Sequence, residues 1–247
     1  MKRFFGLVFV MAGCLAVNTA IADTDIIVYP AKPKTEIIKR PQADIANLQK
    51  EADDGNIKAQ FNLGVLYLEG KKIPQSYDKA IYYFGEAAKQ GDAQAQFNLG
   101  LMYFEGVGVA RDYNQAMKYY KMAAYQYMPK ADFNLAYMYD QGVGTTQDHQ
   151  QAIAWYKKAA DQNVPEAQYN LALIYYRGQG VPVDLHKALE LFKDAAHNDH
   201  ADAAYNAGCM YEQGLGTSID KEKAKSYFKK ACDLHNQDGC KEYKDLL

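Results

Sequence analysis

Apolar and small residues recur along the chain with a period of 36 residues, and within each period they follow a helical spacing. The segments QFNLG, QFNLG, DFNLA, QYNLA and AYNAG begin at intervals of 36 residues. The chain can be divided, without insertion or deletion, into five blocks: 55–90, 91–126, 127–162, 163–198 and 199–234. A period of this length predicts a solenoid, in which each unit buries its apolar face against its neighbours.

Small and apolar side chains mark a first helix in each block. Repeat positions are numbered here from 1 to 36, starting at the first residue of each block. Position 5 is always Ala, position 9 is Leu in four blocks, position 10 is Gly or Ala, and position 13 is always Tyr. Spacings of three and four residues place these side chains on one helical face, with small residues where another helix approaches closely. Position 16 is always Gly, which predicts a left-handed residue just past the helix end.

A second helix is predicted after a glycine-containing loop. Position 22 is Asp in four blocks and Ser76 in the first, and both residue types are good helix N-caps. Position 26 is always Ala, positions 29 and 30 are aromatic in most blocks, and four blocks close on Ala-Ala. The first block has Lys72 instead of Gly at position 18, and Pro74 predicts a differently built loop there. Each block is therefore predicted to be a helix, a loop and an antiparallel helix.

This pattern resembles the Sel-one-like repeat family, a relative of the tetratricopeptide repeats with a longer loop between the helices. Residues 95–124 carry the family pattern A-x-x-x-L-G-x-x-Y-x-x-G-x-G-V-x-x-D, then K-A-x-x-Y-Y-x-K-A-A, almost literally. The resemblance covers residues 55–247 and implies an all-α, right-handed solenoid of antiparallel helix pairs. It also implies a scaffold role in envelope assemblies, signalling or host contact.

Both ends of the repeat array follow the same pattern in shortened form. Residues 43–54 match a second helix, with Ile45, Leu48 and Ala52 in its apolar positions. Residues 239–247, within the C-terminal segment 235–247, match a truncated first helix. We expect these two segments to be capping half-repeats.

The N-terminal region predicts export. Residues 1–22 combine a basic start, an apolar stretch and an A-x-A cleavage site, as in a secretory signal peptide. A lipoprotein acylated at Cys14 and a retained membrane anchor are the alternatives. Residues 23–42 contain three prolines and no helical period, which predicts an extended tether. No later stretch is long and apolar enough to span a bilayer, so we expect a periplasmic or secreted protein.

The charges argue against two classes of partner. Removing Lys2 and Arg3 with the signal peptide leaves 26 of the 28 basic residues against 30 acidic ones, a net charge of 26 − 30 = −4. No block of basic residues is present, which argues against nucleic acid and against an anionic membrane surface as partners. We expect a monomer with a solvated, mixed-charge face on each helix.

Two of the cysteines are placed to form a disulfide. Cys232 at position 34 and Cys240 in the terminal half-repeat flank the short turn DLHNQDG, and an exported chain meets an oxidising compartment. We expect a structural staple, with metal binding or redox catalysis as alternatives. Cys209 at position 11 is expected to be a free thiol. The C-x7-C spacing resembles cysteine-rich secreted members of the family, some of which are credited with binding β-lactams.

That resemblance directs attention to the S-x-x-K motif of penicillin-recognising enzymes, which occurs at Ser76 and at Ser218. The accompanying S-D-N and K-T-G elements are absent, and a helix cap or a loop explains both serines. His197 and His200 with neighbouring aspartates are interpreted as solvated turn residues rather than metal ligands. We expect no catalytic site, no metal and no cofactor.

The remaining candidate is the face of the first helices, which the family fold places on the concave side. Position 7 is aromatic in every block: Phe61, Phe97, Phe133, Tyr169 and Tyr205. Position 8 is always Asn: Asn62, Asn98, Asn134, Asn170 and Asn206. An amide can pair with both the N–H and the C=O of a peptide backbone, and a line of exposed rings marks an interaction surface. The structural alternative is that the rings are half-buried core and the amides bond to neighbouring helices.

The sequence therefore predicts an exported scaffold that binds a protein or peptide partner in a concave groove. The alternatives are a β-lactam-binding or cell-wall-active enzyme and a purely structural spacer.

Overall fold

The computed structural model describes residues 42–247, which form twelve α-helices and no strand. The predicted signal peptide at 1–22 and nearly all of the predicted tether at 23–42 lie outside the described residues. Within the described range the chain forms two compact units, residues 42–162 and residues 163–247. None of the helices in this range is both long and apolar enough to cross a membrane.

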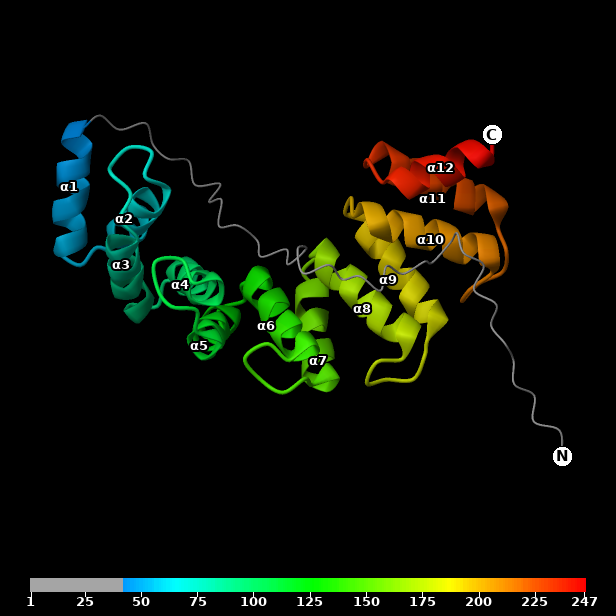
Figure 1. The fold of residues 1–247 in the computed structure, drawn as a ribbon, viewed down its shortest axis with the longest axis horizontal. Helices are drawn as coiled ribbons and strands as arrows, with labels where there is room; N and C mark the ends of the chain where they lie inside the picture. The colour runs from blue at the N-terminus through cyan, green and yellow to red at the C-terminus, as the bar shows by residue number, and fades with distance from the viewer. Residues whose placement is uncertain (1–41) are drawn as a thin grey trace. The chain divides into compact units, whose positions relative to one another are not determined.

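The N-terminal unit consists of consecutive helix pairs (Figure 1). A capping helix packs on the first pair, each pair packs internally, and the second helix of one pair packs on the first helix of the next. The helices are α1 (Gln42–Asp53), α2 (Ile57–Glu69), α3 (Tyr77–Lys89), α4 (Ala93–Glu105), α5 (Tyr113–Ala124), α6 (Pro129–Gln141) and α7 (His149–Ala160).

The C-terminal unit repeats this arrangement with two pairs and a short final helix. Its helices are α8 (Pro165–Arg177), α9 (Leu185–His197), α10 (Ala201–Gln213), α11 (Lys221–Asp233) and α12 (Gln237–Asp245). The predicted all-α solenoid of antiparallel helix pairs is thus confirmed for the described residues.

The helix ends follow the sequence pattern. The five glycines at position 16 are left-handed C-caps, with φ between 65° and 75°. Position 22 supplies the predicted N-caps, whose side chains accept from main-chain N–H groups of the following turn: Ser76, Asp112, Asp148, Asp184 and Asp220. These caps satisfy groups that a helix end would otherwise leave without a partner.

The loop glycine at position 18 allows one repeat to touch the previous one. A Cβ atom at Gly108 would lie 2.2 Å from Cβ of Tyr77, and one at Gly144 would lie 2.4 Å from Cβ of Tyr113. Both glycines also have a positive φ, of 73° and 70°. Lys72 in the first repeat has no positive φ, in agreement with the differently built loop predicted there.

One pair of aromatic rings lies at the centre of every repeat. The position 7 ring of the first helix packs on the position 30 ring of the second, with centroids 5.7–5.8 Å apart in all five repeats. All five position 30 side chains are fully buried: Phe84, Tyr120, Tyr156, Phe192 and Phe228. Position 10 has to be small because this ring lies against it. A Cβ at Gly64 or Gly100 would lie 2.5 Å from the ring.

We predict that Phe97→Ala lowers the free energy of unfolding by about 3–5 kcal/mol, because it removes one ring of a buried pair and leaves a cavity. Tyr125→Ala, in the same repeat, is the control, since Tyr125 is 71% exposed and its ring makes a T-shaped contact with Trp155. It should cost less than about 1 kcal/mol. Urea denaturation followed by circular dichroism measures both. Equal costs for the two variants would contradict a core role for Phe97.

Candidate interaction surface

The position 7 side chains are less exposed than the sequence suggested. Phe61, Phe97 and Phe133 are buried, with 5–6% of their surface accessible. The expectation of an exposed line of rings is therefore wrong in the N-terminal unit. The physical reason is the small residue at position 10, which brings the two helices close enough for the position 7 ring to lie against the position 30 ring. Whether these residues also contact a ligand stays a prediction.

The five asparagines at position 8 do not share one environment. Asn62 is exposed and Asn170 is half-buried, whereas Asn98, Asn134 and Asn206 are 5–8% exposed. Burial raises the pKa of the Tyr120 hydroxyl, and the adjacent Asn134 amide acts to lower this pKa. Among the described residues, Tyr120 Oη and Asn134 Nδ2 form no hydrogen bond of ordinary geometry. The asparagines are therefore not an evenly exposed ladder.

The C-terminal unit keeps more of the predicted face accessible. Tyr169 on α8 and Tyr205 on α10 are half-buried, because each adds a hydroxyl to a ring that is otherwise packed in the core. Burial, followed by the charges of Asp238, Glu242 and Glu212, raises the pKa of Tyr205 to about 12. The Tyr205 hydroxyl therefore stays protonated at neutral pH and can donate a hydrogen bond.

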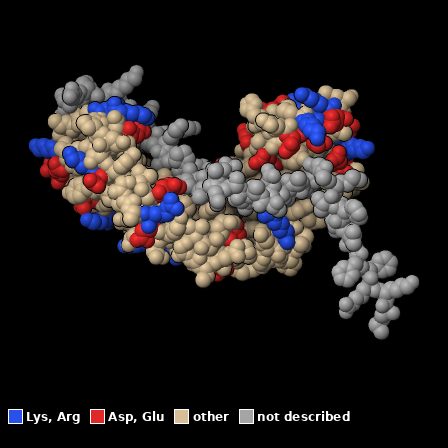
Figure 2. Space-filling view, viewed as in Figure 1, with Lys and Arg blue, Asp and Glu red and all other residues tan. Residues whose placement is uncertain are grey.

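Two further observations describe this surface. The His200 ring stacks on Tyr169 with centroids 4.4 Å apart, and its Nδ1 faces the N–H of Ala203 at 3.2 Å. His200 is thus the N-cap of α10. Among the described residues, no group of three or more side chains of the metal-ligating types occurs. Acidic and basic side chains are interspersed on the face shown in Figure 2.

A ladder of side-chain amides, buried at position 6 and missed by the sequence analysis, joins the repeats. Position 6 accepts a side-chain hydrogen bond from position 36 of its own repeat, as in Gln90 to Gln60 (2.8 Å) and Gln126 to Gln96 (2.7 Å). Position 6 also donates to the position 34 carbonyl of the preceding unit. Gln60 donates to Ala52 (3.0 Å), and Gln96 donates to Ala88 (3.1 Å). The recurrence of Gln at positions 6 and 36 is the sequence signal from which these hydrogen bonds could have been predicted.

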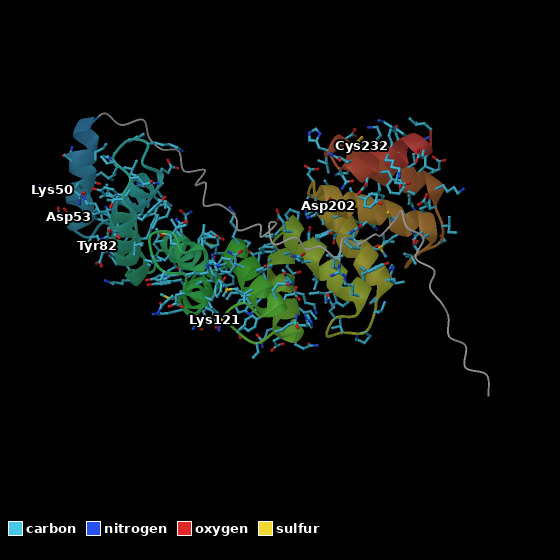
Figure 3. The ribbon with its side chains drawn as sticks, in the orientation of Figure 1. Lys50, Asp53, Tyr82, Lys121, Asp202 and Cys232 are labelled. Carbon is cyan, nitrogen blue, oxygen red and sulfur yellow. A yellow bond between two sulfur atoms is a disulfide. The ribbon has the colours of Figure 1, made fainter. Side chains whose placement is uncertain are left out.

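The disulfide takes the place of this ladder at the C-terminal end (Figure 3). Cys232 at position 34 and Cys240 at position 6 are bonded, with a Cα–Cα distance of 4.3 Å. Gly239 replaces the Ala of position 5, and a Cβ there would lie 2.5 Å from Cβ of Ala231. The close approach of α12 to α11 thus needs a glycine beside the bond. The same pair of positions is joined by an amide hydrogen bond in repeats 1 and 2 and by a covalent bond at the end.

The remaining candidates have structural explanations. Cys209 is buried and disulfide-bonded, so the expectation of a free thiol was wrong. Ser76 Oγ accepts from the N–H of Lys79 at 3.4 Å, while Lys79 Nζ lies 3.5 Å from the Tyr67 hydroxyl. Ser218 is exposed in the loop before α11. Both serines therefore lie where the sequence analysis placed them, at a helix cap and in a loop.

Five consecutive segments of the chain match the Sel1 repeat family: residues 57–92, 93–127, 129–164, 165–200 and 201–236. The protein therefore belongs to the Sel1 repeat family. The family resemblance drawn from the repeated motif is thereby confirmed.

Solved structures of family members support this assignment. A Sel1 repeat protein from Oxalobacter formigenes is 36% identical, with a TM-score of 0.73 over 82% of this chain and 59% of that protein. A protective antigen of uropathogenic Escherichia coli strains, which displays an SLR fold, is 29% identical, with a TM-score of 0.79 over 81% of this chain and 43% of that protein. This chain spans about half the length of these two proteins. No curated protein sequence matches it.

We predict that reducing the Cys232–Cys240 bond destabilises the C-terminal end by about 2–3 kcal/mol, the loop-entropy value for so short a closed loop. The loss should begin in α12, because a repeat array transmits stability mainly between neighbours and a nine-residue helix is marginal alone. Hydrogen exchange with and without reductant measures this, and Cys232→Ser/Cys240→Ser is the matched variant. Alkylation of both thiols in the unreduced protein would contradict the prediction.

Proposed function

We propose that this protein is an exported scaffold that binds an extended, partly apolar segment of a protein partner on the face of its first helices. Members of the Sel1 repeat family are typically protein–protein interaction scaffolds. The Cys232–Cys240 disulfide supports export, because such bonds persist in oxidising compartments. The basic and apolar N-terminal segment at 1–22 supports it independently.

The observation that carries the proposal is the surface formed by Tyr169, Asn170 and Tyr205. All three side chains are half-buried and lie at positions 7 and 8 of the first helices α8 and α10. Tyrosine combines a large apolar ring with a hydroxyl that can donate a hydrogen bond, and such residues dominate many protein interfaces. In the N-terminal unit the equivalent rings are buried, so we place the main contribution to affinity in the C-terminal unit.

We predict that Tyr205→Ala weakens binding about tenfold, because one or two central rings usually dominate an interface. Affinity capture from an envelope extract, with mass spectrometry, identifies the partner, and calorimetry with its purified binding segment gives the affinity. Tyr205→Phe keeps the ring pair with Phe228 and tests the hydroxyl alone. Tyr82→Ala, at a 58% exposed site in the other unit, is the control. Full affinity in folded Tyr205→Ala and Asn170→Ala variants would exclude this surface.

The scaffold proposal also predicts that the purified protein does not hydrolyse a chromogenic cephalosporin. A serine nucleophile needs an adjacent base, whereas the Lys79 ammonium lies near the Tyr67 hydroxyl and 5.0 Å above the Tyr67 ring. Ser76→Ala and Ser218→Ala should behave like the unaltered chain. Turnover that disappears in either serine variant would favour the enzyme alternative.

A further inference from the structure

Two junctions in the N-terminal unit, α1–α2 and α3–α4, are built in the same way. The turn begins with a glycine of positive φ, Gly55 or Gly91. The next residue, Asn56 or Asp92, caps the following helix with its side chain. A glutamine at position 6 then donates to the last turn of the preceding helix, at 3.0 Å and 3.1 Å.

The α5–α6 junction lacks all three features. Its turn residue is Tyr127, which has a φ of 60° although a bulky side chain disfavours this conformation. The N-cap residue of α6 is Met128, which makes no side-chain cap hydrogen bond. Position 6 is Asp132 instead of Gln. A carboxylate accepts hydrogen bonds but cannot donate one.

Asp132 is buried, with 2% of its surface exposed. Its Oδ2 accepts a hydrogen bond from Gln162 Nε2 at 3.1 Å, as position 6 does in repeats 1, 2 and 4. Its Oδ1 is buried without a hydrogen-bond partner in the described residues. Ala124, at the end of α5, occupies the position whose carbonyl accepts from Gln in the preceding two junctions. The ionised carboxyl group of Asp132 therefore has no hydrogen to donate at the position where the glutamine amides donate an N–H.

We propose that Asp132 makes the α5–α6 junction a pH-dependent joint, which is tight when the carboxyl group is protonated and loose when it is ionised. A protonated carboxyl group can donate to the main chain at the end of α5 while still accepting from Gln162. The ionised form leaves a buried charge and a buried oxygen with no donor, which is costly. The α5–α6 turn also lacks the glycine and the side-chain cap of the other two junctions, so the contact of position 6 carries more of the connection there.

The charged surroundings of Asp132 are simple. From α7, Lys158 is the charged group that acts on the carboxyl group and lowers its pKa, and Gln162 also lowers it through its hydrogen bond. No titratable group of α5 acts on it. Burial is the largest effect and raises the pKa of Asp132 from 3.8 to about 6.

The sign of the pH dependence follows from this shift. Because the folded-state pKa is above the unfolded value of 3.8, the stabilising contribution is fully present below pH 3.8 and is lost as the pH rises through about 6. Complete loss changes the equilibrium constant for opening by about 100-fold. The joint should therefore be loose at neutral pH and tighten as the pH falls towards 4.

Native-state hydrogen exchange tests the proposal on the full chain. The readout is the protection factor of the first turn of α6 relative to the first turn of α4, between about pH 4.5 and 7.5. The ratio should fall at least tenfold in the unaltered chain and stay flat in Asp132→Gln. The matched exchange Gln96→Asp should transfer the pH dependence to α4. All variants retain His200, which lies in the C-terminal unit. A change at His200 therefore cannot produce a difference between variants in the ratio of the two protection factors.

A flat ratio in the unaltered chain, or the same pH profile in Asp132→Gln, would overturn the proposal. If Asp132→Gln does not fold, the carboxyl carbon of Asp132 can be titrated by NMR in the unaltered chain. A midpoint near 6 supports the joint, and a midpoint below about 4.5 overturns it. Comparing the opening of α6 with that of α4 separates this device from general acid denaturation, which would affect both helices.

Discussion

The contact between the position 7 ring and the position 30 ring is the constraint on which every repeat depends. It recurs with almost the same centroid separation in all five repeats, although Phe and Tyr are exchanged on either side. The contact explains why position 10 is Gly in three repeats, because a Cβ at Gly208 would lie 2.7 Å from the Phe228 ring. The other two repeats carry Ala, the smallest side chain, at this position. A solenoid has no single central core, so each unit has to supply its own rigid pair. The half-exposed tyrosines of the proposed binding surface owe their fixed orientation to the same contact.

A second set of interactions joins one repeat to the next, and it varies along the chain. Amide hydrogen bonds from position 6 connect α2 to α1 and α4 to α3 in the N-terminal unit, and a disulfide connects the same two repeat positions at the C-terminal end. Ala204 and Leu234 replace the amides of positions 6 and 36 in the fifth repeat. Ring pairs thus give each repeat the same interior, while the contacts at the junctions differ in kind. The α5–α6 junction combines Asp132 instead of Gln at position 6 with a turn that has neither a glycine nor a side-chain cap.

Much of the fold could be predicted from the sequence because the signals were local and repeated five times. The glycine at position 16 and the cap at position 22 report a helix end within a few residues, and both were present as predicted. The burial of Phe61, Phe97 and Phe133 could not be predicted. Periodicity shows which residues share a helical face, but it does not show how closely the partner helix covers that face. The amide ladder was missed for a related reason. Gln60 and Gln90 are separated by 30 residues, and a polar residue in a repeat is ordinarily a surface residue.

A double-mutant cycle between Phe97 and Tyr120 tests the central role of the ring pair most directly. The free energy of unfolding is measured for the unaltered chain, Phe97→Leu, Tyr120→Leu and the double variant, so that each ring is replaced by an apolar side chain and the pairwise energy is isolated. The account predicts a coupling energy of about 0.5–1.5 kcal/mol, the range for packed aromatic pairs. Strictly additive losses would contradict it, and would mean that the two rings contribute only as separate apolar side chains.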